Sequence, residues 1–250
     1  MSDHDSICRR LDWDSDFFAC NIARMTVERL TEETVAQARA WCECNGIDCL
    51  YFLADATDPT TVTLAEGNGF HLVDVRLTLE RKLKDIPPSR PVPGVIRPGT
   101  VLDGPVLRLI ASQSHRDSRF YYDPYFSTSQ CDALYQTWIE KSLNGYAEAI
   151  LVAELEKETV GYISCHLRSP TTGQIGLFAV GSKARGKGLG QDLVRESLWW
   201  FASKGILRVT VVTQGRNVSA QRLYQRCGFE TQSLQLWYHR WFPREGEIGA

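Results

Sequence analysis

Residues 177–205, which read LFAVGSKARGKGLGQDLVRESLWWFASKG, decide the fold class of this sequence. The segment opens with the apolar end of a strand, Leu177-Phe178-Ala179-Val180, and passes through a polar loop to Arg185-Gly186-Lys187-Gly188-Leu189-Gly190. Apolar residues then recur at helical spacing up to Lys204, and Gly205 is typical of the position after a helix end. The pattern predicts a strand, a glycine-rich loop and a long amphipathic helix.

The glycine-rich run has the properties of an anion site. Backbone N–H groups converge at a helix start, and glycines let a pyrophosphate approach the backbone, while Arg185 and Lys187 add positive charge. A dinucleotide fingerprint would need a parallel β-α-β unit with an acidic ribose partner, and a Walker loop would need Ser or Thr where Gly188 follows Lys187. Three glycines before a helix also fit a flexible turn, so the flanking segments decide the interpretation.

The segments around this run alternate between strand and helix patterns. Upstream we predict a strand at Val95–Arg97 and a helix from Asp103 to Ala111. A second helix is expected to start near Ser129 and to end at Asn144-Gly145. A meander of three strands is then predicted over 147–153, 159–167 and 173–180. Downstream we predict a strand over 207–213, a helix over 218–226 and a final strand over 229–241.

An internal repeat links the two halves of the chain. Gly69-Phe70 matches Gly228-Phe229 at an offset of 159 residues (69 to 228), and the same offset places four further segments on their equivalents: Val35 on Val194, Trp41 on Trp200, Gly46-Ile47 on Gly205-Ile206, and Leu64 on Leu223. The first copy has Asp58 in place of Asn217, Ala65 in place of Tyr224, and no glycine-rich loop. We predict an incomplete, scaffold-like copy that binds no coenzyme.

A proline-rich run separates the two copies. Residues 85–94 contain four prolines, which exclude both helix and central strand. We therefore predict an amino-terminal domain over residues 1–84, a linker over 85–94 and a larger domain over 95–250.

Composition excludes several classes of protein. The 43% hydrophobic and 23% charged residues are typical of a globular chain. A net charge of -2 lacks the positive charge that is typical of proteins that bind nucleic acid. The charged amino terminus and the lack of a long apolar stretch predict a cytoplasmic protein without a membrane segment. Eight cysteines are expected to be free thiols, and Cys42, Cys44 and Cys49 lack the second ligand pair of a zinc site. A homodimer is expected only because dimers are common.

The glycine-rich segment resembles motif A of the GNAT superfamily of N-acetyltransferases, and Asn217, Tyr224 and Gly228-Phe229 resemble its motif B. The resemblance covers most of residues 147–241. It implies an α/β (α+β) fold with a twisted, mixed, mostly antiparallel sheet flanked by helices, and acetyl-CoA as co-substrate without a metal. The loop from Arg185 to Gly190 would hold the coenzyme pyrophosphate, and the strand at Phe178, Ala179 and Val180 would pair with the pantetheine arm.

Acetyl transfer to an amine needs a polarised thioester carbonyl and a proton for the departing thiolate. Backbone N–H groups near Phe178–Val180 are candidates for the first task, and Tyr224 is the candidate acid, unless its ring only packs. Asn217 binds the pantetheine arm, caps its helix, or does both. No general base is evident, because His166 could face either side of its strand and either contact substrate or be structural.

Residues 114–126 are rich in arginine and aromatic side chains, among them Arg119 and Tyr122. Such residues clamp phosphates and stack on bases, or form an aromatic minicore between two helices. Ser118-Arg119-Phe120, together with residues 11–18, 135–140 and 217–224, resembles the GNAT acetyltransferases of dTDP-linked 4-amino-4,6-dideoxyhexoses, whereas residues 121–124 depart from that pattern. That resemblance implies a nucleotide-sugar substrate, acetylated at its 4-amino group for cell-surface polysaccharide assembly.

Two other functions remain open. A GNAT enzyme could acetylate a protein amino terminus or another small amine, although a peptide acceptor would favour an acidic groove over an arginine-rich one. A degenerate module could bind acetyl-CoA without catalysis. The presence of Asn217, Tyr224 and the intact loop argues against that last function.

Overall fold

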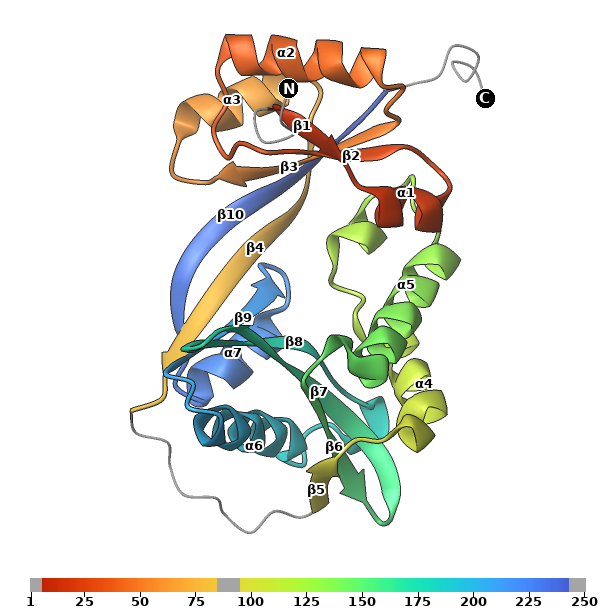
Figure 1. The fold of residues 1–250 in the computed structure, drawn as a ribbon, viewed down its shortest axis with the longest axis vertical. Helices are drawn as coiled ribbons and strands as arrows, with labels where there is room; N and C mark the ends of the chain where they lie inside the picture. Colours follow the sequence, from red (N-terminus) through yellow and green to blue (C-terminus); the bar gives the residue numbers. More distant parts are fainter. Residues whose placement is uncertain (1–5, 85–94, 243–250) are drawn as a thin grey trace. The chain divides into compact units, whose positions relative to one another are not determined.

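The computed structural model describes residues 6–84 and 95–242 (Figure 1). The proline-rich run over 85–94 lies outside the described residues. The elements follow in the order β1 (Cys8–Arg10), α1 (Asp12–Phe18), β2 (Ile22–Met25), α2 (Glu32–Cys44), β3 (Cys49–Asp55), α3 (Pro59–Gly67), β4 (His71–Lys82), β5 (Val95–Pro98), α4 (Gly104–Ser114), α5 (Thr128–Lys141), β6 (Ala149–Leu155), β7 (Glu158–Ser169), β8 (Thr172–Val180), α6 (Leu189–Ser203), β9 (Arg208–Gln214), α7 (Val218–Arg226) and β10 (Glu230–Trp241).

The described chain divides into two compact units at positions that differ from the predicted boundary. Unit 1 holds residues 6–76, Arg119–Phe126 and 234–242, and unit 2 holds the described parts of Leu77–Ser118 and Ser127–Ser233. The difference arises because β4 and β10 are long strands, each with its first part in one unit and its second part in the other. A proline-rich run marks a break in regular structure, and it gives no information on such shared strands.

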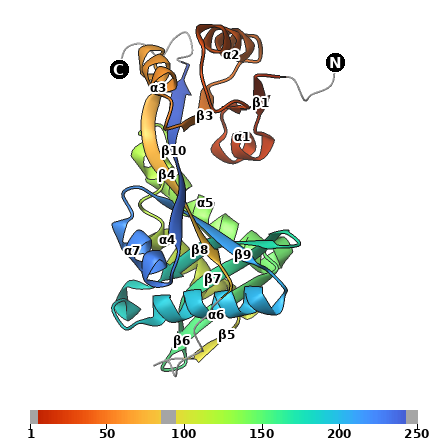
Figure 2. The same ribbon diagram turned by 90° about the vertical axis from the view of Figure 1, so that its left-hand side faces the viewer.

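The sheet of unit 2 is the predicted meander extended by one parallel strand. Its strands β5, β6, β7 and β8 pair as antiparallel neighbours, and β9 joins β8 in parallel. Side chains alternate between the faces of β7. Tyr162 reaches His115 at the end of α4, whereas a Cβ at Gly161 would lie 3.3 Å from Leu193 of α6. The helices α4 and α6 therefore cover opposite faces of this sheet (Figures 1 and 2).

The core of unit 2 lies mainly between the sheet and α6. Helix α6 buries one apolar face, the one predicted from its spacing, against strand residues of β6 to β9. The buried residues of this core include Ile163, Cys165, Ile175, Leu193, Val194, Leu198, Phe201, Val209 and Val211.

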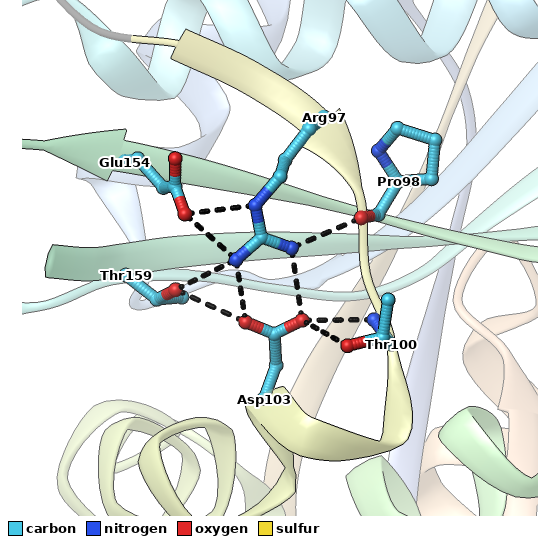
Figure 3. Close-up of polar contacts among 6 residues, drawn as sticks. All are labelled: Arg97, Pro98, Thr100, Asp103, Glu154 and Thr159. Atoms are coloured by element: carbon cyan, nitrogen blue, oxygen red, sulfur yellow. Dashed lines mark hydrogen bonds and ion pairs between the residues drawn. The ribbon is translucent and has the colours of Figure 1, made fainter. Parts of the chain in front are cut away.

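An ion-pair network fixes the amino-terminal edge of unit 2 (Figure 3). The guanidinium of Arg97 on β5 donates to both carboxylate oxygens of Asp103 at 2.8 and 3.0 Å and to Glu154 of β6 at 2.8 Å. Asp103 also accepts the N–H of Thr100 at 2.8 Å and the hydroxyl of Thr159 at 3.1 Å. Because Asp103 precedes α4, the network ties the start of that helix to three strands.

The start of α5 differs from the prediction. The residue that caps the helix is Ser127, whose hydroxyl accepts the N–H of Gln130 at 3.2 Å. The Gln130 side chain in turn accepts the N–H of Ser127 at 3.1 Å, which completes a capping box. Ser129 begins a Ser-x-x-Asp pattern, but the sequence also contains Ser127-x-x-Gln130, whose glutamine at the fourth position makes it the capping-box pattern.

Unit 1 has its own set of paired strands and its own core. Within it β1 and β2 are antiparallel, β2 and β3 parallel, and β3 and β10 antiparallel. Leu50, Phe52 and Ala54 of β3 pack against α2 and α3 on one face. The alternate residue Tyr51 lies on the other face, where Arg119 stacks over its ring.

The elements of the two repeat copies coincide at the offset of 159 residues. The strand β3 (Cys49–Asp55) corresponds to β9 (Arg208–Gln214), and helix α3 (Pro59–Gly67) corresponds to α7 (Val218–Arg226). Their helix caps correspond as well, since Asp58 accepts the N–H of Thr61 at 3.2 Å and Asn217 accepts that of Ala220 at 3.0 Å. The same local fold is thus encoded twice.

Candidate active site

Strands β8 and β9 of unit 2 diverge along their length. Their parallel pairing joins Thr172–Ile175 to Arg208–Val211, and among the described residues it extends no further, although β8 continues to Val180 and β9 to Gln214. From Gly176 onward β8 therefore presents an edge that is not paired to β9. Such an edge can accept an extended ligand as an additional strand would be accepted.

The backbone of Val180 points to this open edge. Successive N–H groups of a strand alternate between its two neighbours. The N–H of Gly181 donates to the carbonyl of Val160 on the β7 side at 2.8 Å, so the N–H groups of Val180 and Phe178 point the other way. The Val180 carbonyl on that edge accepts the Nε–H of Arg185 at 3.1 Å. The amide donors of Phe178 and Val180 thus face outward from the part of β8 that is not paired to β9.

A bulge in β8 lies beside this edge and is held by the side chains of β7. The register shifts between Ile163 and Cys165, and there the N–H of Leu177 donates to the hydroxyl of Ser164 at 2.7 Å. That hydroxyl lies 3.2 Å from Nε2 of His166. A Cβ at Gly176 would lie 2.4 Å from the same nitrogen, so only glycine fits against this buried pair.

His166 is therefore placed inside unit 2. Its side chain is buried, its ring packs on Tyr146 at 5.4 Å between centroids, and its pKa is lowered by burial and then by Arg168. The hydroxyl of Ser164 thus accepts the Leu177 N–H and also shares a hydrogen bond with Nε2 of His166. A neutral His166 that orders the bulge is the role this geometry describes.

The glycine-rich loop is an open cradle of amides. Gly186 and Gly188 have φ of +78° and +85°, a region that favours glycine, and a Cβ at Gly186 would meet nothing within 4 Å. The first amides that bond back to the loop are those of Gln191 and Asp192, both to the Gly188 carbonyl. The preceding N–H groups at the start of α6 lack intrahelical acceptors, as at every helix start. The loop fits the diphosphate of a coenzyme.

Gly190 has a different role in this loop. A Cβ at this position would lie 3.2 Å from Cζ of Phe178 and 3.6 Å from Cδ2 of Leu223. The first turn of α6 therefore packs directly on the open part of β8. Leu189 is buried, whereas Arg185 and Lys187 are exposed beside the loop.

Helix α7 places Tyr224 against β8. The ring is 4% exposed, and its centroid lies 6.1 Å from that of Phe178 and 5.6 Å from that of Phe229. Burial raises the pKa of Tyr224 above its usual value. The phenol is therefore protonated at neutral pH. The carboxamide of Asn217 caps this helix, so the capping role considered from the sequence is present.

The arginine-rich segment over residues 114–126 is divided between the units. His115 belongs to unit 2, where its Nε2 lies 2.9 Å from the Tyr162 hydroxyl and its ring stacks on Tyr135 at 4.4 Å. Burial lowers the pKa of His115 to about 4. Arg119 and Tyr122 belong to unit 1, and the Tyr122 side chain is exposed.

Arg119 takes part in a buried polar chain within unit 1. Its Nη1 donates to Nε2 of His239 at 2.6 Å, and Nδ1 of His239 donates to Asp123 at 2.5 Å. Nε1 of Trp241 donates to the same carboxylate at 2.9 Å. Burial, followed by the Arg119 charge, lowers the pKa of His239 to about 4 against the opposite effect of Asp123. Sequence analysis missed His239 because its partners are about 120 positions away and no local pattern marks it.

The described residues were also searched for metal-binding clusters and for membrane-spanning helices. No cluster of His, Cys, Asp and Glu side chains suited to a metal ion is found within residues 6–84 and 95–242. None of the helices in this part of the chain is both long and apolar enough to cross a membrane.

Comparison with known proteins finds acetyltransferases similar to this chain. The acetyltransferase (GNAT) family model matches residues 114–229. The chain is similar to "dTDP-fucosamine acetyltransferase" of Escherichia coli O6:H1, at 27% identity over 92% of this chain and 96% of that protein. It is also similar to "Spore coat polysaccharide biosynthesis protein SpsD" of Bacillus subtilis, at 30% identity over 55% of this chain and 47% of that protein.

The fold has solved relatives. A GCN5-related N-acetyltransferase from Sphaerobacter thermophilus matches with a TM-score of 0.65 at 16% identity, over 94% of this chain and 76% of that chain. The predicted GNAT fold, with a mixed sheet flanked by helices, is therefore confirmed. Residues 114–229 thus match the acetyltransferase (GNAT) family, and the chain has the fold of solved acetyltransferases of that family.

Proposed function

We propose that the protein transfers the acetyl group of acetyl-CoA to the amino group of a nucleotide-linked amino sugar of the dTDP-4-amino-4,6-dideoxyhexose type. The similarity to a dTDP-fucosamine acetyltransferase over nearly the whole of both chains supports this acceptor class. The similarity to a protein of spore coat polysaccharide biosynthesis supports a role in polysaccharide assembly. The observation that carries the proposal is the open edge of β8, which meets both the glycine-rich loop and the Tyr224 ring.

The residues of unit 2 would hold acetyl-CoA at two places. The amides from Gly186 to Gly190 would bind the diphosphate, with the charges of Arg185 and Lys187 beside it. The N–H groups of Phe178 and Val180 would bind the carbonyl oxygens of the extended arm or of the thioester. When bound, the coenzyme supplies an acetyl group already activated as a thioester.

Tyr224 would donate the proton that the departing thiolate needs. A phenol in this setting remains protonated at neutral pH because burial raises its pKa. The ring contact with Phe178 places it beside the strand that would carry the thioester. In this mechanism the enzyme holds the two reactants in position and supplies one proton, and the amine is the nucleophile.

No side chain is assigned as general base. His166 is buried and shares a hydrogen bond with the Ser164 hydroxyl, so we propose that it orders the β8 bulge, in place of the substrate contact considered from the sequence. A sugar amine with a pKa near about 8 is partly neutral at pH 7 and can release its second proton to water after attack. Arg119 and Tyr122 are retained as candidates for binding the nucleotide.

A thiol-release assay with acetyl-CoA tests the acceptor class. The panel should contain dTDP-4-amino-4,6-dideoxyhexoses, the matching free amino sugars, a polyamine and peptides with free amino termini. We expect kcat/KM for the dTDP-linked sugars to exceed that for the free sugars by at least 100-fold. Turnover of peptides or polyamines alone would overturn the proposal in favour of another small-amine or amino-terminal acetyltransferase.

A further inference from the structure

Two arginine side chains of unit 1 lie over one tryptophan of β10, and a third bonds a nearby residue of the same strand. The Cζ atoms of Arg119 and Arg24 lie 4.3 and 5.2 Å from the centroid of the Trp237 ring. Nη1 of Arg76 donates to Oε1 of Gln235 at 2.5 Å, and Gln235 lies two positions before Trp237, on the same face of the strand. We call Arg24, Arg76, Arg119 and Trp237 the arginine–tryptophan cluster.

The three cations of this cluster have no anionic partner. Within the described residues no carboxylate lies at ion-pair distance from Arg24, Arg76 or Arg119. Glu28 is near enough to favour the charged forms of Arg24 and Arg76, but its carboxylate accepts the Gln235 amide at 3.0 Å. All three side chains are half-buried. Partly buried cations without counter-charge are costly, and a bound anion would offset that cost.

The mutual effects of these charges agree with the geometry. Burial is the first cause that lowers the pKa of Arg24, and the positive charges of Arg9, Arg119 and Arg76 follow. Four arginines thus act on one region of unit 1. Three exposed arginines elsewhere in the unit form ion pairs instead: Arg10 with Asp12, Arg29 with Asp55 and Arg39 with Glu43.

The aromatic part of the cluster defines the rest of the ligand. An indole offers a flat face on which a nucleobase stacks, and guanidinium groups bind diphosphate oxygens in pairs. The hydroxyl of Tyr51 adds a polar group: its side chain is fully buried, its oxygen has no hydrogen-bond partner, and Arg119 lies 4.2 Å from its ring. Several cations beside an aromatic face match a nucleoside diphosphate better than a simple anion.

We propose that the arginine–tryptophan cluster binds the nucleoside diphosphate part of the acceptor, an inference that rests on the proposed function. The amino-terminal copy of the repeat then has a task of its own. It lacks equivalents of the glycine-rich loop and of Tyr224. Its task would be to recognise the acceptor nucleotide, whereas the other copy would bind the coenzyme.

Calorimetric titration of the full chain with dTDP tests this site without any turnover. We expect Arg24→Gln and Arg76→Gln each to weaken dTDP binding at least tenfold. The matched control Arg29→Gln, from the same unit but with an ion pair, should change the Kd by less than twofold. Arg119 is left intact because it also holds His239. Thermal unfolding and an unchanged Kd for acetyl-CoA would establish that each variant is folded.

The outcomes separate this inference from the proposed function. The inference is overturned if wild-type protein does not bind dTDP, if Arg24→Gln and Arg76→Gln bind it as the wild type does, or if Arg29→Gln weakens binding equally. If dTDP binds through the cluster but dTDP-linked amino sugars are not acetylated, the proposed function fails while the site stands. If those sugars are acetylated with an unchanged KM in Arg24→Gln and Arg76→Gln, the site fails while the function stands.

Discussion

The Tyr224 ring lies 6.1 Å from the Phe178 ring, which joins helix α7 to the part of β8 that has separated from β9. Phe178 also lies under the first turn of α6, because a Cβ at Gly190 would approach its ring to 3.2 Å. One aromatic side chain therefore contacts both the helix of the predicted acid and the helix of the predicted phosphate loop. The relative positions of acid and coenzyme depend on this packing.

Replacing Tyr224 by Phe should lower kcat at least 100-fold and leave the acetyl-CoA Kd within about threefold of wild type. The substitution removes the proton donor and keeps the ring that packs on Phe178 and Phe229. Steady-state thiol release and calorimetric titration of acetyl-CoA measure the two effects. An unchanged kcat would remove Tyr224 as the acid.

Replacing Gly188 by Ala should weaken acetyl-CoA binding by about tenfold or more. The φ of +85° strains any other residue, and a side chain would occupy the region where the diphosphate must approach the amides. Gly205 is the matched control, because it has φ of +76°, lies at the other end of α6 and has open space around it. Gly205→Ala should lose similar stability and bind acetyl-CoA normally; equal losses of affinity in both variants would refute a phosphate site at the loop.

Replacing Gly176 by Ala should lower kcat about tenfold or more, because the new Cβ would push His166 and Ser164 away from the β8 bulge. Ser164→Ala should act in the same direction more weakly, since it removes the acceptor for the Leu177 N–H. The pH dependence of kcat/KM separates this positioning role from a base role. We expect its acidic limb to be unchanged in both variants, and a shifted limb would show that His166 titrates during the reaction.

Stability should fall as the pH falls from about 6.5 to about 4, because His115 and His239 are neutral in the native protein. The pKa values of His115 and His239 are lowered from 6.5 to about 4, so the unfolded chain takes up protons in this range before the native chain does. Each contributes a slope of up to about 1.4 kcal/mol per pH unit within that window and nothing above it.

Urea unfolding at several pH values measures these slopes. His115→Phe should reduce the slope between pH 6.5 and 4, whereas the exposed His71 offers a control whose replacement should leave it unchanged. A slope that is the same in wild type and His115→Phe would contradict a buried neutral histidine at this position.

Replacing Asp103 by Asn should destabilise the protein by about 2 kcal/mol, because the carboxylate accepts charged hydrogen bonds from Arg97 and caps the turn at Thr100. The network holds the pKa of Asp103 well below its usual value, so this contribution is present above about pH 4 and is lost at lower pH. Asp12→Asn breaks an exposed pair with Arg10 and should cost less than about 0.5 kcal/mol. Chemical denaturation at pH 7 compares the two, and equal effects would contradict a special role for the Arg97 network.

Local signals in the sequence were sufficient for the elements of the glycine-rich half. Helix α7 occupies the predicted residues 218–226, and α6 begins at Leu189, within the predicted glycine-rich run of Arg185–Gly190. Both are bounded by caps and glycines whose effects reach only a few residues. The repeat also predicted the elements of the first copy, because several residues match at one constant offset and each match supports the alignment of the others.

Long-range pairings could not be read in the same way. The chain from Arg119 through His239 to Asp123 joins residues about 120 positions apart, and neither the arginine nor the histidine has a local pattern that announces a partner. The sequence also did not predict that β4 and β10 each belong to both units. Alternating apolar residues predict a strand, but they do not predict which strand it pairs with. His166 was left open between two faces for that reason, and the contact with Ser164 decides its side.

The most direct test of the account is the identity of the acetylated atom. A dTDP-4-amino-4,6-dideoxyhexose labelled with ¹⁵N at the amine should be incubated with ¹³C-carbonyl acetyl-CoA and the wild-type protein, and the product analysed by NMR. The account predicts a one-bond coupling between the carbonyl carbon and the sugar nitrogen, formed at least 100-fold more slowly by Tyr224→Phe. Acetyl found on oxygen, or no acetylated sugar at all, would contradict it.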